Sequence, residues 1–173
     1  MTTKQENILE AALQLFATEG FHATSTSKVA KAAGVSEGLI FRHFGNKDGL
    51  LQAVISQGEA SFTTLFAGVV METDPKTMIR KALSIPFEVP ESEYTFWKLQ
   101  FSLKWELGYN ATAKMEPLTV ALTHAFTKLG YAKPALEAEL LLHLLEGVGS
   151  AILKGALTDR AAIKQLMLER YEV

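Results

Sequence analysis

Helical periodicity of the apolar residues runs along almost the whole chain and is the feature that most constrains its fold. In the first segment, about residues 4–19, Ile8, Ala12 and Phe16 share one helix face, and Gly20 is a natural stop. No segment alternates apolar and polar residues cleanly between turn residues, as half-buried strands do. We therefore expect an all-α fold, with three compact helices followed by a larger helical body.

Start and stop signals divide the rest of the chain into further helices. Ser25 and Asn46 carry side chains that cap helix N-termini, and Pro75 suits a first helical position. Pro86 and Pro90 are expected to flank a loop. We expect helices over about residues 26–33, 36–44, 47–70, 92–107, 116–129 and 134–154, one beginning at 75 and one at 159.

The composition is that of an ordinary globular domain and excludes several classes of protein. Of the 173 residues, 48% are hydrophobic and 21% are charged, so a core is possible and disorder is not expected. The absence of cysteine excludes disulfides and thiolate metal sites. Acidic residues at the N-terminus argue against a signal peptide, and no run reaches the roughly 18 apolar residues of a membrane span. We expect a cytoplasmic protein with no membrane partner, metal or cofactor.

Residues 25–44, STSKVAKAAGVSEGLIFRHF, have the pattern of a helix-turn-helix. Ala30 is small where the two helix axes approach, and Gly34 tolerates the positive φ of the turn. Three branched residues fill the wedge between the helices: Val29, Val35 and Ile40. Ser36 is expected to cap the second helix. The face of that helix turned to the DNA major groove would carry Glu37, Gly38, Leu39, Arg42 and His43.

The charge balance gives this motif little general help in attracting DNA. The net charge is −2, and the first fifty residues hold five basic and five acidic side chains. Any contact with nucleic acid must therefore come from donors placed locally on the motif.

These residues closely resemble the TetR family of one-component bacterial repressors. The matching positions are Gly20, Thr24-Ser25, Val29-Ala30, Ala33-Gly34-Val35-Ser36, Gly38, Ile40-Phe41, His43-Phe44 and Lys47-Asp48-x-Leu50. The resemblance covers roughly residues 5–55, and its combined spacing is highly specific. Beyond residue 60 nothing matches at the level of motifs, as expected of a family whose ligand domains diverge.

The resemblance implies a role for each matching residue. Phosphates would be bound by the hydroxyls and backbone N–H groups of Ser25, Thr26 and Ser36. The flanking DNA backbone would be bound by the side chains of His43 and Lys47. Gly38 would let the helix approach the bases, where Glu37 could accept from a cytosine amine and Leu39 could touch a thymine methyl. Glu37 could equally pair with Arg42 or stay solvated. Phe41 departs from the usual tyrosine and lacks the hydroxyl that commonly bonds a phosphate.

A second cluster, of aromatic residues, gives a candidate ligand site. Trp97, Phe101 and Trp105 recur every four residues and so line one helix face. Core packing would explain the same spacing. The family resemblance implies a ligand cavity among the central helices, with walls from Phe87, Phe96, Trp97, Phe101 and Trp105, and with His124 or Glu106 as polar contacts. Such walls suit a small apolar or aromatic effector.

The segment at residues 135–154 gives a candidate dimer interface. It has a broad apolar face formed by Leu140, Leu141, Leu144, Leu145 and Val148, and small residues that allow close helix approach at Gly147, Gly149 and Ala151. In a monomer these residues would be core. The resemblance implies that the last two helices pair with their copies in a homodimer, with His143 packed in the core or interface rather than bound to a ligand.

The sequence argues against an enzyme. The four histidines share no metal-ligand spacing, and no nucleophile elbow, phosphate-binding glycine loop or dinucleotide fingerprint occurs. A helical protein with the motif but without ligand control stays possible.

We expect a dimeric repressor with a DNA-binding domain at residues 1–46 and a ligand-binding and dimerisation domain at residues 47–173. The two recognition helices would enter successive major grooves of a palindromic double-stranded operator. A small-molecule effector would release the DNA, with the helix from residue 47 to about residue 70 as the lever. Activation, or no ligand at all, remains open.

Overall fold

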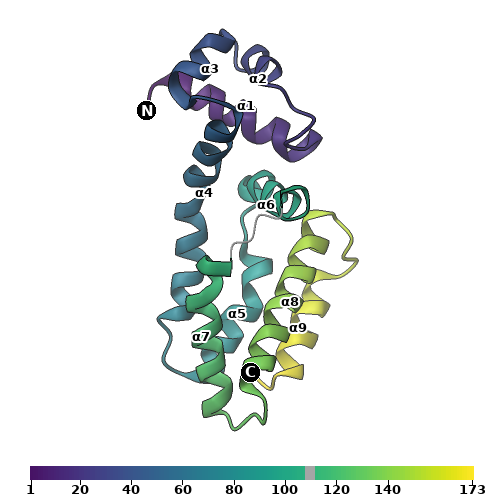
Figure 1. Cartoon of the computed structure of the whole chain (residues 1–173). Coiled ribbons are helices and arrows are strands. Elements are labelled where there is room, and N and C mark those ends of the chain that lie inside the picture. Colours follow the sequence, from purple (N-terminus) through teal and green to yellow (C-terminus); the bar gives the residue numbers. More distant parts are fainter. Residues whose placement is uncertain (108–111) are drawn as a thin grey trace. The chain divides into compact units, whose positions relative to one another are not determined.

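The computed structural model describes the backbone of residues 1–107 and 112–173, and the side chains of these residues except 59–62, 105 and 112–114. Every regular element in this part of the chain is helical, as predicted (Figure 1). The helices are α1 (Thr3–Glu19), α2 (Thr26–Ala32), α3 (Glu37–Phe44), α4 (Lys47–Val70), α5 (Pro75–Glu88), η1 (Glu91–Glu93), α6 (Tyr94–Glu106), α7 (Thr112–Lys128), α8 (Pro134–Leu153) and α9 (Arg160–Arg170).

The predicted caps and stops fix the ends of the first helices. The Ser25 hydroxyl accepts from the backbone N–H of Lys28 at 3.1 Å, and Asn46 Oδ1 accepts from that of Gly49 at 2.7 Å. Gly20, Gly34 and Gly45 follow α1, α2 and α3 with φ of 88°, 65° and 77°, a conformation that favours glycine.

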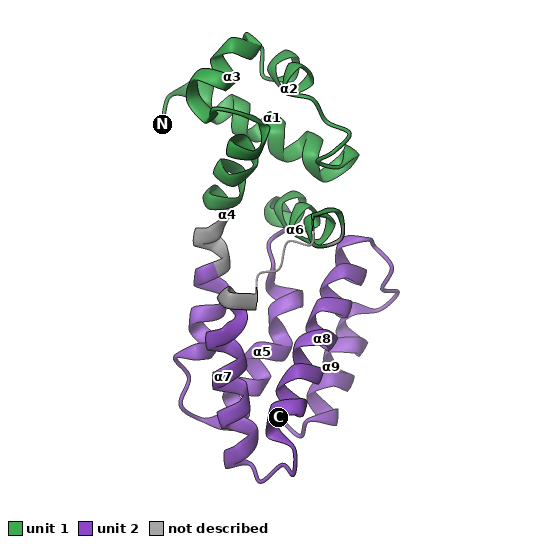
Figure 2. Cartoon of the chain, in the orientation of Figure 1, with its two compact units in different colours: residues 1–61, 92–109 green, residues 62–91, 110–173 purple. Residues whose placement is uncertain are grey.

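The chain forms two compact units, and the first is discontinuous in sequence (Figure 2). It joins residues 1–61 to residues 92–109, so α6 belongs with the N-terminal helices. Leu99 and Leu103 of α6 are fully buried in a core that also contains Ile8 and Phe16 of α1 and Ile40 of α3. The expected division of function at residue 46 stays a prediction.

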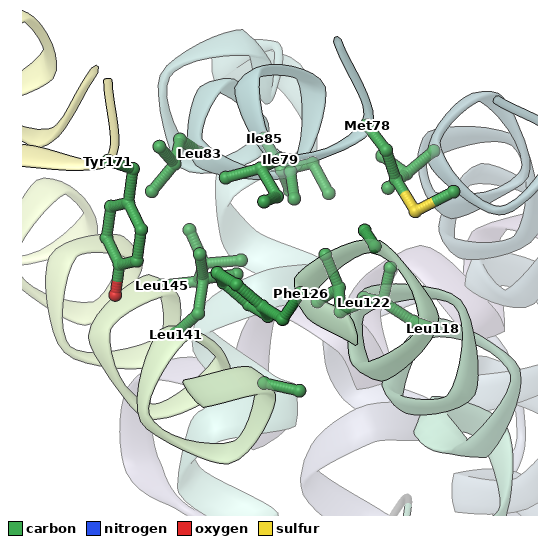
Figure 3. Close-up of a cluster of buried hydrophobic side chains, with 14 of the residues drawn as sticks. Met78, Ile79, Leu83, Ile85, Leu118, Leu122, Phe126, Leu141, Leu145 and Tyr171 are labelled. Atoms are coloured by element: carbon green, nitrogen blue, oxygen red, sulfur yellow. The ribbon is translucent and has the colours of Figure 1, made fainter. Parts of the chain in front are cut away.

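The second unit, residues 62–91 and 110–173, is built around α5, which packs against α7, α8 and α9. Figure 3 shows Ile79 and Ile85 of α5 on the side facing Phe126 of α7 and Leu141 and Leu145 of α8. Tyr171, which follows α9, closes the cluster, with its ring centroid 6.0 Å from that of Phe126.

One expected loop is wrong. Pro86 lies inside α5 and is buried, whereas the sequence suggested that Pro86 and Pro90 flank a loop. Proline removes the N–H that would bond to the carbonyl of Ala82. Burial of Leu83, Ile85 and Pro86 in the second unit offsets this loss, and the helix ends two residues later at Glu88.

The turn from α4 into α5 concentrates several hydrogen bonds on one carboxylate. Glu72 accepts from the Lys81 ammonium at 2.6 Å and from the backbone N–H groups of Thr73 at 2.8 Å and Asp74 at 3.1 Å. The Lys81 hydrogen bond and these two amides lower the pKa of Glu72 to about 2, from an ordinary value of 4.5.

This shift predicts a contribution to stability that acid removes. Because the native pKa lies below the unfolded one, the contribution is present above about pH 4.5 and is lost as the pH falls towards 2. Glu72→Gln should therefore lower the melting temperature at pH 7. On acidification, the melting temperature of this variant should fall by less than that of the wild type. Glu88→Gln is the control, since Glu88 meets Lys164 at 3.6 Å on a more exposed surface. Parallel acid profiles for the wild type and Glu72→Gln would contradict this account.

The junction of α3 and α4 admits no side chain at Gly49. A Cβ built there would lie 2.0 Å from the carbonyl oxygen of Phe44, a backbone atom that cannot move aside cheaply. At Gly38, by contrast, a Cβ would meet nothing within 4 Å.

Gly49→Ala should therefore destabilise the protein by about 1–3 kcal/mol, as overpacking usually does. Gly38→Ala is the matched control, and should raise stability by about 0.5–1 kcal/mol because alanine favours a helix over glycine. Chemical denaturation of the two variants measures the difference. Equal stabilities would show that the α3–α4 junction relaxes without cost.

Candidate DNA-binding surface

The helix-turn-helix is assembled as the sequence predicts. Val29, Ala30 and Ile40 are buried, and Val35 is packed against the same core. The backbone N–H of Val35 donates to the carbonyl of Ala30 at 3.0 Å, which closes the turn around Gly34. The wedge between α2 and α3 is therefore filled by the predicted apolar residues.

The predicted DNA-contacting side chains of α3 divide into exposed and half-buried ones. Gly38, Arg42 and His43 are exposed, and Phe41 is 46% exposed, a large fraction for an aromatic ring. Leu39 is half-buried because it packs against the core of the first unit. Its access to a thymine methyl is correspondingly restricted.

Two of the predicted contact residues bind each other. The Thr26 hydroxyl donates to Glu37 Oε1 at 2.6 Å, from the first residue of α2 to the first residue of α3. From sequence, Thr26 was expected to bind a phosphate, and Glu37 was expected to accept from a cytosine amine, to pair with Arg42 or to stay solvated. The hydrogen bond fixes the carboxylate at the start of α3, where the helix dipole favours negative charge.

The two serines differ in how their hydroxyls are used. Ser25 caps α2, yet its hydroxyl hydrogen remains able to donate to a phosphate. Ser36 occupies the N-cap position of α3 in an extended conformation, but its side chain makes no cap hydrogen bond, contrary to expectation. The first amides of α3 thus lack that side-chain acceptor, as suits an anion site.

His43 is held by the first turn of α1. Gln5 Oε1 accepts a hydrogen bond from the backbone N–H of Thr2 at 2.8 Å. The other end of the same amide, Gln5 Nε2, lies 3.3 Å from His43 Nδ1. With Gln5 donating, Nδ1 is the acceptor, and Nε2 of His43 carries the proton of the neutral ring. The imidazole can then donate to a phosphate.

The cations beside the motif are partly engaged within the protein. Lys47 donates to the carbonyl oxygen of His22 at 3.3 Å, and its ammonium lies 4.4 Å from the centre of the Phe21 ring. Lys28 pairs with Glu19. An ammonium has three donors, so Lys47 keeps capacity for a phosphate.

The predicted ligand residues of α6 lie in the first unit. Phe96 is buried, and its ring packs directly on α4 at Gly58. A Cβ added to Gly58 would lie 2.0 Å from the Phe96 ring. Trp97 and Phe101 are half-buried, and the indole N–H of Trp97 donates to Glu93 at 3.4 Å. The side chain of Trp105 lies outside the described residues.

The other predicted ligand residues lie in the second unit. Phe87 is half-buried, with the Lys164 ammonium 5.9 Å from its ring centre, while His124 is exposed on α7. Glu106, considered as a polar ligand contact, instead accepts hydrogen bonds from the backbone of Phe21 and His22 in the first unit. The ligand site stays a prediction.

The candidate dimer face on α8 separates into buried and exposed residues. Leu141 and Leu145 are buried within the second unit, whereas Leu136 and Leu140 are 57% and 60% exposed. These two exposed leucines are four residues apart, so they share a helix face. Leu166 on α9 is also 60% exposed, and a Cβ at Gly147 would meet nothing within 4 Å.

The described residues include neither a membrane-spanning helix nor a cluster of metal-binding side chains. None of the described helices is long and apolar enough to cross a membrane. Within the same residues, no group of three or more histidine, aspartate or glutamate side chains could hold a metal ion.

The N-terminal residues match a known family of regulators. The family model described as bacterial regulatory proteins, tetR family, matches residues 8–54. The HTH-type transcriptional regulator YvkB of Bacillus subtilis is 47% identical over 57 residues, which is 33% of this chain and 30% of that protein. The match therefore spans less than a third of this curated relative.

Solved structures match the fold over nearly the whole chain. A TetR-like transcriptional regulator from Rhodococcus sp. RHA1 aligns with a TM-score of 0.80 and 20% identity, covering 96% of this chain and 92% of that one. FadR from Bacillus subtilis, solved in complex with stearoyl-CoA, aligns with a TM-score of 0.66 and 20% identity, covering 95% of each chain. Residues 8–54 thus form a domain that matches the tetR family of bacterial regulatory proteins, and the chain has the all-helical fold of a TetR-like regulator.

Proposed function

We propose that this protein is a transcriptional repressor that binds a palindromic operator as a homodimer and is released from the DNA by a small molecule. The observation that carries the proposal is the α2–α3 motif, whose apolar wedge is buried while Gly38, Arg42 and His43 stay exposed on α3. A helix anchored on one side and exposed on the other is what the major groove requires.

Hydroxyls, amides and a few cations would supply the phosphate contacts. Ser25 and Ser36 offer hydroxyls at the N-termini of α2 and α3, where backbone N–H groups also favour an anion. His43 offers an N–H, and Lys47 an ammonium at the edge of the motif. These donors give affinity without sequence preference.

Base reading would come from the exposed part of α3. The open space around Gly38 lets the helix backbone approach the base edges. Glu37, held by Thr26, could accept from a cytosine amine, and the exposed Phe41 ring could contact a thymine methyl or a sugar. Phe41 would replace a phosphate hydrogen bond by an apolar contact.

The effector would be small and apolar or aromatic. The support is the row of aromatic side chains on α6, of which Trp97 and Phe101 are half-buried. The solved FadR complex contains stearoyl-CoA, so acyl-CoA thioesters are suitable first probes for this chain. An effector that binds a DNA-incompetent conformation more tightly must be bound less tightly by the DNA complex.

Operator binding tests the proposal, with Gly38→Leu as the diagnostic variant. The wild type should bind DNA from upstream of its own gene, two chains per site, against excess competitor DNA. Gly38→Leu should abolish this binding without lowering the melting temperature, because a Cβ at this helical position meets no other atom of the protein within 4 Å. Gly68→Leu is the matched control, since Gly68 is a helical glycine in equally open space on α4. Specific binding by Gly38→Leu, or weak nonspecific binding by the wild type, would contradict the proposal.

The homodimer is tested on the exposed leucines of α8. Leu140→Arg should give monomers at concentrations where the wild type is dimeric, because an apolar side chain that is 60% exposed in the single chain would be covered by the second copy. Operator affinity should fall with it, since the half-sites are no longer linked. Light scattering after gel filtration measures the mass. Val120→Arg on α7, at a residue 63% exposed, is the control, and loss of the dimer there but not in Leu140→Arg would place the interface elsewhere.

A further inference from the structure

We propose that Glu106 is a positioning residue for the DNA-binding helices, because it fixes the turn between α1 and α2 from the end of α6. The proposal rests on the proposed function, since what it positions is the helix-turn-helix. The contact joins Glu106 to Phe21, 85 positions away in the chain.

Glu106 lies at the end of the helix face that docks α6 in the first unit. Phe96, Leu99 and Leu103 are 7%, 0% and 0% exposed, and they follow one another at intervals of three and four residues. Glu106, three residues after Leu103, continues the same face. The two buried leucines therefore fix where the carboxylate at the helix end can reach.

The carboxylate binds the turn through its backbone amides. Glu106 Oε2 accepts from the N–H of Phe21 at 2.9 Å and from that of His22 at 3.4 Å, and Oε1 accepts from the Ser102 hydroxyl at 3.0 Å. The approach is close, since a Cβ at Gly20 would lie 2.7 Å from Oε1. A glycine at this position leaves room for the carboxylate.

The position of this charge is unfavourable for α6 itself. Glu106 is the last residue of the helix, where the helix dipole disfavours an anion. Two backbone N–H donors, and one hydroxyl, offset that cost at this point. The acidic side chain thus serves the turn rather than the stability of its own helix.

The turn is also held from its other side and leads directly into the recognition motif. Lys47 of α4 binds the carbonyl of His22, and the buried Thr24 hydroxyl donates to the carbonyl of Gly20 at 2.8 Å. Ser25, the next residue, caps α2. With its amides held by α6 and its carbonyls held by α4 and Thr24, the turn fixes the direction in which α2 begins. A binding site of this kind must be held to within about half an ångström.

The test compares Glu106→Ala with Glu91→Ala in the full-length protein. Both variants remove one negative charge, and removal of a negative charge by itself strengthens DNA binding. A loss of operator affinity in Glu106→Ala would therefore be opposite in sign to the electrostatic effect. Glu91 is exposed in η1, outside the docked face. Affinity for the operator is measured at fixed salt, together with amide hydrogen exchange at Phe21 and His22 and the melting temperature.

Glu106→Ala should lose exchange protection at both amides and bind operator about tenfold more weakly than Glu91→Ala, while still melting well above the assay temperature. Glu106→Gln keeps an acceptor oxygen and should lie between the two. Unchanged operator affinity with protection lost would overturn the positioning role, and retained protection would overturn the contact. If the wild type and Glu91→Ala bind no operator, the proposed function fails, and the exchange measurement still decides whether Glu106 holds the turn.

Discussion

The burial of Leu99 and Leu103 against α1 holds the first unit together. Both side chains are fully excluded from solvent in a core shared with Ile8, Phe16 and Ile40. Each fully buried leucine contributes about 1.5–3 kcal/mol, so α6 supplies a substantial part of the stability of the unit that carries the recognition motif. The recognition helix depends on this core, because α3 has eight residues and a helix of that length is marginal by itself.

The features predicted from sequence are those that local chemistry determines. Ser25 and Asn46 cap helices because their side chains reach amides three residues away, and Gly34 turns the chain because it tolerates positive φ. The helix-turn-helix, the all-α fold and the family that the N-terminal domain matches could therefore be predicted. Pro86 could not, because burial in the second unit overrides its tendency to end a helix.

Contacts between distant residues account for the parts of the candidate site that sequence analysis missed. Thr26 and Glu37 were assigned separately to DNA, yet they bind each other across the two helices. Glu106 was considered as a ligand contact, yet its oxygens accept from the turn after α1. The spacing of Phe96, Leu99 and Leu103 with Glu106 places all four on one helix face, and this spacing is visible in the sequence.

Because the first unit is discontinuous in sequence, it cannot complete its fold until α6 has been synthesised. When residue 61 has left the ribosome, Ile8 and Phe16 still lack the leucines that complete their core, and residues 62–93 must emerge before α6 begins to do so. The N-terminal helices therefore expose apolar surface during synthesis for longer than a contiguous domain of the same size would. The same dependence limits domain exchange, because residues 1–61 moved to another helical body would keep this core only beside an α6 whose face fits it.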